Sequence, residues 1–460
     1  MNPTRQDIVS ASGELAAGTL KPSDLLDAHI ARIEKLEPGL NAYIRLTLDQ
    51  ARQSAKAADG RRSRAAPLSP LDGIPIALKD NIDLAGVETT NGMAFGEVPA
   101  VDADVVATLK AAGAVILGKL NLHEGALGAT TDNPHHGRTH NPWRTGFTPG
   151  GSSGGSGAGV AAGLCLAALG TDTMGSVRLP AAYNGVVGLI PTRGMLSMRG
   201  VVPLSRRLDN VGPLCGSVRD AALLLEILAG HSLGGAMISP AGTGEDTGTS
   251  QAGGLAGLRV GLLTNFEAVP CDADVGAAFA VAVEKLRGAG ADIETMSVLG
   301  YDADQARRAG FLVSEADGAA EHATWMTERP DAFSPAFFRM LCYGRDAPEA
   351  RLKAALELIE NAGRAFRSLL GTDGRVDLIV SPTAPQTAFP FDAKTPSSQA
   401  DFTALASFAG CPAISVPCGV TPAGLPVGLQ LIAAPSDEGR LLSAAMAFER
   451  RVTIPAPPLS

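Results

Sequence analysis

The pattern of apolar and polar positions alternates between helical and strand spacing along the first third of the chain. Residues 23–36 carry leucine and isoleucine at helical spacing, which predicts an amphipathic helix with Ser23 as its N-cap. Residues 73–79 and 114–118 are short apolar runs of the kind found in buried strands, and residues 105–112 between them predict a helix. This alternation is typical of an α/β fold.

The same alternation continues through the rest of the chain. Helices are predicted at 158–169 and 274–288, and buried strands at 258–263, 377–380, 413–417 and 429–433. A stretch rich in Gly, Ser and Thr from about 234 to 254 predicts a flexible insertion. Because helices and strands flank it on both sides, we expect one large α/β domain spanning residues 1–460.

Composition narrows the function classes. The chain has 460 residues, of which 45% are hydrophobic and 18% charged, so it can bury a large core. Its 38 Lys and Arg against 47 Asp and Glu leave a net charge of −9, which argues against nucleic acid or an anionic membrane as the main partner. Six scattered cysteines, without zinc or disulfide spacing, favour a cytoplasmic protein.

The glycine-rich loop before residue 158 matches two general motifs. Gly157-x-Gly159-x-x-Ala162 fits a dinucleotide fingerprint, but a Pro-Gly loop stands where a strand should precede it. Overlapping Gly-x-Ser-x-Gly patterns around Ser152 and Ser153 match the nucleophile elbow of α/β-hydrolases. That fold needs a downstream histidine, and the two histidines beyond residue 140 have no motif-like setting.

Three histidines, His135, His136 and His140, are close enough in sequence to suggest a metal site. They lie in a turn-rich segment without helical spacing, so a solvated or turn-stabilising role is favoured. A hydrolase without a well-placed histidine needs another base. Buried Lys79, at the end of an apolar strand, offers one because desolvation lowers the pKa of an amine. An ion pair of Lys79 with Asp80 or Asp83 explains the same position equally well.

A second candidate segment, residues 170–180, places small residues before Ser176. Successive backbone N–H groups there could converge on an anion, as an oxyanion hole requires. Asp172 and Arg178 flank this serine and could pair to hold the turn. An ordinary loop between two elements remains the alternative.

Together these segments resemble the amidase signature family. The resemblance rests on residues 70–81, 148–156, 170–181, 185–192, 410–417 and 424–430. It covers most of the chain and is most specific from 71 to 213, which places a catalytic core at about 68–215. It implies a single amidase-signature domain in which a mixed central β-sheet is covered by helices on both faces.

The resemblance also implies a catalytic triad. Ser176 is the nucleophile, Ser152 is a bridging serine held in a cis peptide bond, and Lys79 is the base; the two serines lie 24 positions apart, as in the family. No metal or organic cofactor is implied, because nucleophile, base and oxyanion donors all come from the chain. Ser153, Asp172 and Arg178 are expected to support these groups.

An oxyanion hole is implied at the backbone N–H groups of Thr173, Met174, Gly175 and Ser176. The family commonly has glycine where this chain has Met174. If that position needs a positive φ, methionine costs about 1 kcal/mol and tilts its N–H group. If it does not, the methionine side chain shapes the pocket.

The function implied is hydrolysis of a small-molecule or aryl amide through an acyl-enzyme on Ser176. Alternatives are a carbamate hydrolase (urethanase) or urea-derivative hydrolase, an amidotransferase-type subunit that works in a complex, and a binding protein that kept the fold. We expect a small-molecule amide or carbamate substrate, no nucleic-acid or membrane partner, and a monomer or homodimer.

Three segments are expected to line the substrate pocket: residues 89–95, residues 127–132 and a variable region at about 300–350. The last contains Phe333, Phe337, Phe338 and Met340, which suggest a partly apolar acyl or aryl group. Packing of a helical core explains these four residues about as well.

Overall fold

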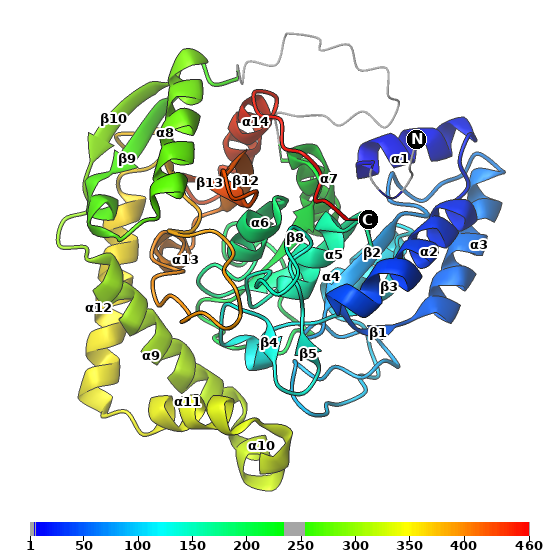
Figure 1. The fold of residues 1–460 in the computed structure, drawn as a ribbon, viewed down its shortest axis with the longest axis horizontal. Helices are drawn as coiled ribbons and strands as arrows, with labels where there is room; N and C mark the ends of the chain where they lie inside the picture. The colour runs from blue at the N-terminus through cyan, green and yellow to red at the C-terminus, as the bar shows by residue number, and fades with distance from the viewer. Residues whose placement is uncertain (1–3, 5, 234–253, 460) are drawn as a thin grey trace.

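The computed structural model describes residue 4, residues 6–233 and residues 254–459. In this part of the chain, eleven strands form one sheet in the order β1-β3-β2-β6-β8-β7-β12-β13-β11-β9-β10 (Figure 1). These strands are β1 (Tyr43–Leu46), β2 (Pro75–Lys79), β3 (Val115–Leu120), β6 (Ala167–Asp172), β7 (Val187–Ile190), β8 (Asn210–Cys215), β9 (Arg259–Leu263), β10 (Asp292–Met296), β11 (Leu378–Pro382), β12 (Ala413–Val420) and β13 (Pro426–Ala433). The short β4 (Asp132–Asn133) and β5 (Gly137–Arg138) pair separately.

The sheet is mixed, as the resemblance implied. Strand β2 runs parallel to both β3 and β6, whereas β8, β7, β12, β13 and β11 follow one another antiparallel. At the far edge β11, β9 and β10 are parallel again. The first helices, drawn blue, and the yellow-green α9–α12 lie on opposite sides of the molecule (Figure 1).

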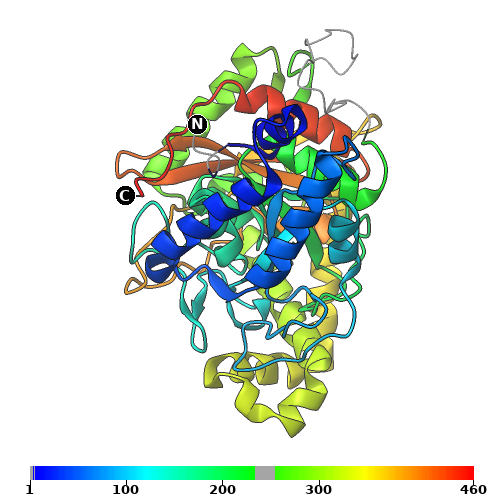
Figure 2. The same cartoon turned by 90° about the vertical axis from the view of Figure 1, so that its right-hand side faces the viewer.

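The α-helices cover both faces of this sheet. They are α1 (Ile8–Ala17), α2 (Pro22–Leu40), α3 (Leu48–Arg62), α4 (Asp104–Ala111), α5 (Gly154–Ala161), α6 (Arg178–Asn184), α7 (Val218–Ala229), α8 (Ala273–Gly288), α9 (Ala303–Glu321), α10 (Ala323–Glu328), α11 (Pro335–Arg345), α12 (Glu349–Arg367), α13 (Ala404–Ala409) and α14 (Glu438–Glu449). Side by side, α2 and α3 cover one end of the sheet (Figure 2).

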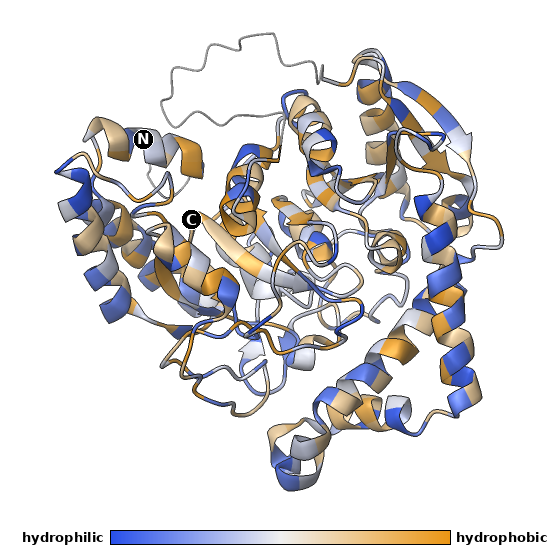
Figure 3. Ribbon diagram, turned by 180° about the vertical axis from the view of Figure 1, so that it is seen from behind, coloured by the Kyte–Doolittle hydropathy of each residue, from blue (hydrophilic) through white to orange (hydrophobic). Residues whose placement is uncertain are grey.

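Alternate residues of β2 show how the two cores are divided. Ile76 and Leu78 join a cluster with α1, α4, α7, α8 and α14, while Ala77 joins the opposite cluster with α3, α5, α9, α12 and α13. Successive side chains of a strand point to opposite faces. Lys79 therefore falls on the same face as Ala77, toward α5. The outer helices interleave apolar and polar positions, as helices with one packed face do (Figure 3).

Two helices predicted from the sequence differ in the structure. The first runs from Pro22 to Leu40 and passes through Pro38, so Ser23 lies inside the first turn and Lys21 takes the N-cap position. Pro22 occupies the start because its missing N–H has no helical partner there. The prediction of a helix at 158–169 is wrong in its second half: α5 ends at Ala161, and Gly163 turns the chain with φ 70°.

The apolar run after Gly163 becomes β6, which lies between β2 and β8. A fully buried strand is apolar throughout, so periodicity alone does not distinguish it from a buried helix. Residues 234–253 of the insertion predicted at about 234–254 lie outside the described residues. None of the helices in the described ranges is long and apolar enough to cross a membrane.

Candidate active site

Strand β2 carries Lys79 into the protein interior, where its side chain has no exposed surface. Lys79 Nζ lies 2.7 Å from Ser152 Oγ and 2.7 Å from Thr171 Oγ1. Burial lowers the pKa of Lys79 to about 7, although the charges of Asp209 and Asp172 act to raise it. At neutral pH a substantial fraction of this amine is therefore uncharged and able to accept a proton.

The alternative role predicted for Lys79, an ion pair with a neighbouring aspartate, is absent from the described residues. Asp80 instead contacts Lys119, whose Nζ lies 3.0 Å from its carboxylate, and both side chains are buried. Asp80 also accepts a hydrogen bond of 2.9 Å from the N–H of Thr90. The carboxylate next to Lys79 is thus ion-paired with a different lysine.

The loop before α5 places two serines beside β6. The peptide bond between Gly151 and Ser152 is cis, and Ser152 is fully buried. Ser153 Oγ donates to the carbonyl of Thr171 at 3.1 Å, and its N–H donates to the carbonyl of Ser176 at 3.2 Å. Within the described residues no hydrogen bond joins the Ser176 and Ser152 hydroxyls. Ser153 therefore acts as a link between the two loops.

Asp172, at the end of β6, holds the turn that carries Ser176. Its carboxylate accepts hydrogen bonds from the N–H of Gly175 at 2.6 Å and of Val177 at 3.0 Å. Arg178 donates to it from Nε at 3.0 Å and from Nη2 at 2.8 Å. Burial opposes ionisation, but the Arg178 charge and these donors outweigh it and hold the pKa of Asp172 below its ordinary value.

Arg178 is completely buried, and every N–H of its guanidinium has an acceptor. Besides its bonds to Asp172, Nη1 donates to Thr403 O at 2.8 Å and to Gln430 Oε1 at 2.7 Å, and Nη2 donates to Ser407 Oγ at 2.8 Å. A guanidinium has five N–H groups, so none is left unpaired. This pair connects the serine turn to α13 and β13.

The turn between β6 and α6 leaves three N–H groups free. Among the described residues, those of Thr173, Met174 and Ser176 donate to no protein acceptor, whereas that of Gly175 is held by Asp172. Of the four N–H groups predicted to form an oxyanion hole, three therefore have no protein acceptor in the described structure. Free N–H groups are the donors that a developing oxyanion requires.

Glycine is required at position 175 and not at 174. Gly175 has φ 142°, and a Cβ added there would lie 2.4 Å from Thr403 Oγ1. Met174 is not among the described residues with positive φ. Met174 therefore does not have the backbone strain expected for a methionine with positive φ. Its side chain instead lines the pocket, which was the other expectation.

A cavity of about 30 Å³ opens onto Ser176. Its lining is mostly apolar and contains no charged side chain; the residues are Ala126, Leu127, Gly128, Ala129, Gly151, Thr173, Met174, Gly175, Ser176, Leu179, Leu204, Phe311, Ser314 and Ala400. Part of the predicted segment 127–132 lines it, and segment 89–95 does not. Phe311 and Ser314, on α9, line it from the predicted 300–350 region, although the sequence singled out neither residue.

The four residues proposed for the pocket from the 300–350 region lie elsewhere. Phe333 and Phe337 stack with ring centroids 5.7 Å apart, and Phe338 and Met340 pack against the same cluster. Of the two explanations for these residues, packing of a helical core is the one that the structure supports.

Sequence reasoning missed Asp209. Thr173 Oγ1 donates to it at 2.6 Å, and the N–H groups of Leu204 and Ser205 donate at 2.8 and 2.9 Å. Burial raises the pKa of Asp209 to about 6, with those hydrogen bonds and the charge of Lys79 acting against the rise. A carboxylate directly before the apolar strand β8 is the kind of signal that singled out Lys79.

The histidine cluster stabilises turns. His135 Nε2 lies 3.0 Å from Glu124 Oε1, and His136 Nε2 lies 2.9 Å from the carbonyl of Met93. His140 accepts a hydrogen bond from a loop N–H. Across the described ranges, no group of three or more His, Cys, Asp or Glu side chains could hold a metal ion.

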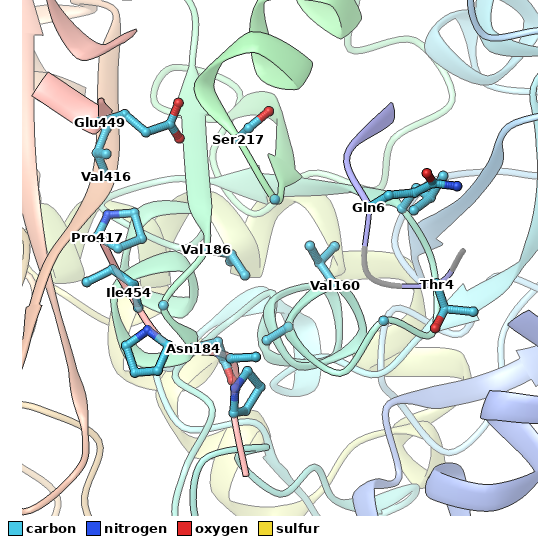
Figure 4. Close-up of a pocket in the computed structure, with 18 of the residues that line it drawn as sticks. Thr4, Gln6, Val160, Asn184, Val186, Ser217, Val416, Pro417, Glu449 and Ile454 are labelled. Atoms are coloured by element: carbon cyan, nitrogen blue, oxygen red, sulfur yellow. The ribbon is translucent and has the colours of Figure 1, made fainter. Parts of the chain in front are cut away.

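A larger cavity of about 430 Å³ lies at the other ends of α5 and α6 (Figure 4). Val160 and Asn184 reach it from these helices, and Gln6 and Glu449 come from the two ends of the chain. Neither Ser176 nor Lys79 lines it. Size alone would therefore select a different cavity from the smaller one, which is lined by Ser176 and by Thr173 and Met174 with their free N–H groups.

Comparison with known proteins shows the family. The family model for Amidase matches residues 24–442. The chain belongs to the amidase signature family.

The amidase-family chain is similar to proteins of more than one described activity. It is 37% identical over 474 residues to a glutamyl-tRNA(Gln) amidotransferase subunit of Synechococcus sp. (strain CC9605), covering 96% of this chain and 95% of that protein. A crystal structure of an amidase superposes with a TM-score of 0.88 at 30% identity, covering 97% and 100% of the two chains. The peptide amidase of Stenotrophomonas maltophilia superposes with a TM-score of 0.81 at 29% identity, covering 99% of each chain.

Proposed function

We propose that this chain hydrolyses the C–N bond of a carboxylic amide, with Ser176 as nucleophile, Ser152 as proton relay and Lys79 as base. The observation that carries the proposal is the buried amine of Lys79, 2.7 Å from the Ser152 hydroxyl. Burial that lowers the pKa of Lys79 to about 7 suits it to general-base catalysis near neutral pH.

The proposed reaction balances without any outside group except water. Neutral Lys79 takes the proton of Ser152 as Ser152 takes that of Ser176, whose oxygen attacks the amide carbonyl. The relay then returns the proton to the departing amine, and water releases the acyl group from Ser176.

Charge on the carbonyl oxygen would be held by the free N–H groups of Thr173, Met174 and Ser176. Each such donor typically contributes about 3–4 kcal/mol to the transition state. The Asp172–Arg178 pair holds the turn in place, and its hydrogen bond to Gly175 removes that N–H from the set of donors. This role for Gly175 differs from the one predicted.

Carbamates and urea derivatives remain substrates of the same chemistry, because their carbonyl group also carries a C–N bond. Matched amide and urethane substrates with the same leaving amine would rank the two classes by kcat/KM. The relay and the oxyanion donors would act in the same way on both.

A second candidate is a component of an amidotransferase complex. It is favoured by the name of the Synechococcus protein, which matches over 96% of this chain. A glutamine acyl donor would bring an ammonium and a carboxylate group, and no charged side chain lines the cavity at Ser176. We therefore propose the stand-alone amidase first. The cytoplasmic location, the absence of nucleic-acid and membrane partners, and the monomer or homodimer stay predictions.

The test is intact-mass analysis after treatment with a fluorophosphonate. We expect one adduct on the native chain, no adduct on Ser176→Ala and slowed labelling of Lys79→Ala. Ser156→Ala is the matched control, because this serine is buried on α5 and its hydroxyl bonds the carbonyl of Leu169 at 3.3 Å. Labelling of Ser176→Ala equal to that of the native chain would refute the assignment.

A further inference from the structure

We infer that Met174 closes the acyl pocket and limits this enzyme to short, uncharged acyl groups, such as acetyl or propionyl. The inference rests on the proposed function and goes beyond it by naming the substrate class. It follows from three features of the described residues: where the methionine side chain ends, what fixes its backbone, and what else lines the cavity.

The side chain of Met174 reaches from the serine turn to α9. Only 6% of the residue is exposed, and it lines the cavity that Ser176 shares. A Cβ added to Gly310 would lie 2.5 Å from Met174 Sδ and 2.7 Å from the Phe408 ring. The thioether therefore packs against Gly310, and glycine at that position of α9 leaves the space it occupies.

The backbone on either side prevents the methionine from moving away. Thr403 Oγ1 donates to the carbonyl of Met174 at 2.6 Å. Gly175, the next residue, fits closely against the same threonine and is also tied to Asp172 through its N–H. Because both peptide groups are held, only a change of rotamer could withdraw the side chain from the pocket.

What remains of the cavity is small and uncharged. Its volume of about 30 Å³ is far below the roughly 300–1,000 Å³ of common small-molecule pockets. Leu127, Leu179, Leu204 and Phe311 form much of the wall. The hydroxyl of Ser314 donates its hydrogen bond to the carbonyl of Gly310 at 2.8 Å, so it is not available as a donor to a bound acyl group. The pocket thus offers apolar contact to a short acyl group and no partner for a charge.

The experiment compares three p-nitroanilides, with acetyl, hexanoyl and γ-glutamyl as the acyl group. The native chain is expected to prefer acetyl. In Met174→Ala the ratio of kcat/KM for hexanoyl over acetyl should rise at least about tenfold, since single methylene groups in apolar pockets change specificity by about 10- to 200-fold. Met296→Ala is the matched control: Met296 is 4% exposed, lies on β10 and does not line the cavity.

Gly310→Ala is the second variant, for use if Met174→Ala does not fold. Its added methyl group would lie 2.5 Å from the present position of Met174 Sδ, so it should displace the thioether and shift preference further toward acetyl over hexanoyl. An unchanged hexanoyl-to-acetyl ratio in a folded Met174→Ala that still labels at Ser176 overturns the inference, as does native preference for γ-glutamyl. A native chain that takes no fluorophosphonate label would instead overturn the proposed function.

Discussion

Replacing Asp172 by asparagine tests whether the buried ion pair holds the serine turn. Asp172 and Arg178 have fully buried side chains and are 2.8 Å apart at their closest atoms. Asparagine has the same shape but leaves the Arg178 charge without its counter-ion. Breaking a buried pair from one side typically costs about 3–5 kcal/mol, because the remaining charge stays desolvated.

The expected change in Tm follows from the size of the chain. Unfolding entropy of about 2.1 cal/mol/K per residue, over 460 residues, amounts to about 1 kcal/mol/K. A loss of 3–5 kcal/mol therefore lowers Tm by about 3–5 °C. The pKa of Asp172 is held below its ordinary value, so this stabilisation is present at neutral pH and is lost only as pH falls through the folded pKa.

Thermal unfolding of four proteins measures the coupling: the native chain, Asp172→Asn, Arg178→Met and the double variant. We expect the double variant to be more stable than the sum of the single losses implies, by about 2 kcal/mol or more, because it removes the unpaired charge. Glu294→Gln is the control. Its partner Arg375 also lies at 2.8 Å, but the two side chains are 39% and 59% exposed, so the loss should stay below about 1 kcal/mol. Equal losses in Asp172→Asn and Glu294→Gln, or strict additivity in the cycle, would refute the reasoning.

Two further predictions concern the site itself. The uncharged amine of Lys79 is the proposed base, and burial lowers its pKa to about 7, so kcat/KM should rise as pH increases through about 7. In Asp209→Asn this rise should move to lower pH, because the charge of Asp209 raises the pKa of Lys79. A pH-rate profile that is flat from 6 to 8, or unmoved in the variant, contradicts this. Gly175→Ala places a Cβ 2.4 Å from Thr403 Oγ1 and should shift the turn, displacing the neighbouring N–H groups of Met174 and Ser176 that are proposed as oxyanion donors. Fluorophosphonate labelling should therefore slow at least about tenfold. Gly276→Ala, with open space around its Cβ, should label at the native rate.

The sequence predicted the α/β fold because the buried side of each helix or strand produces a pattern of apolar residues in that segment. The apolar run ending at Lys79 is a strand in the structure, and the serine segments stand at the ends of strands and helices, as the motifs indicated. This pattern gave the wrong prediction for part of 158–169, because a buried helix and a buried strand are both apolar throughout. Only strand pairing with β2 and β8 distinguishes the two.

The motifs alone determined which residues could act: a lysine at a strand end, two serines 24 positions apart and an Asp and Arg around the second. Tertiary structure decided which of them contact one another. Asp80 pairs with Lys119 and not with Lys79, and Met174 fits because Gly310, on a distant helix, leaves room for its sulfur atom. Both outcomes depend on contacts between residues far apart in the chain, and periodicity reports only how each segment buries its own side chains.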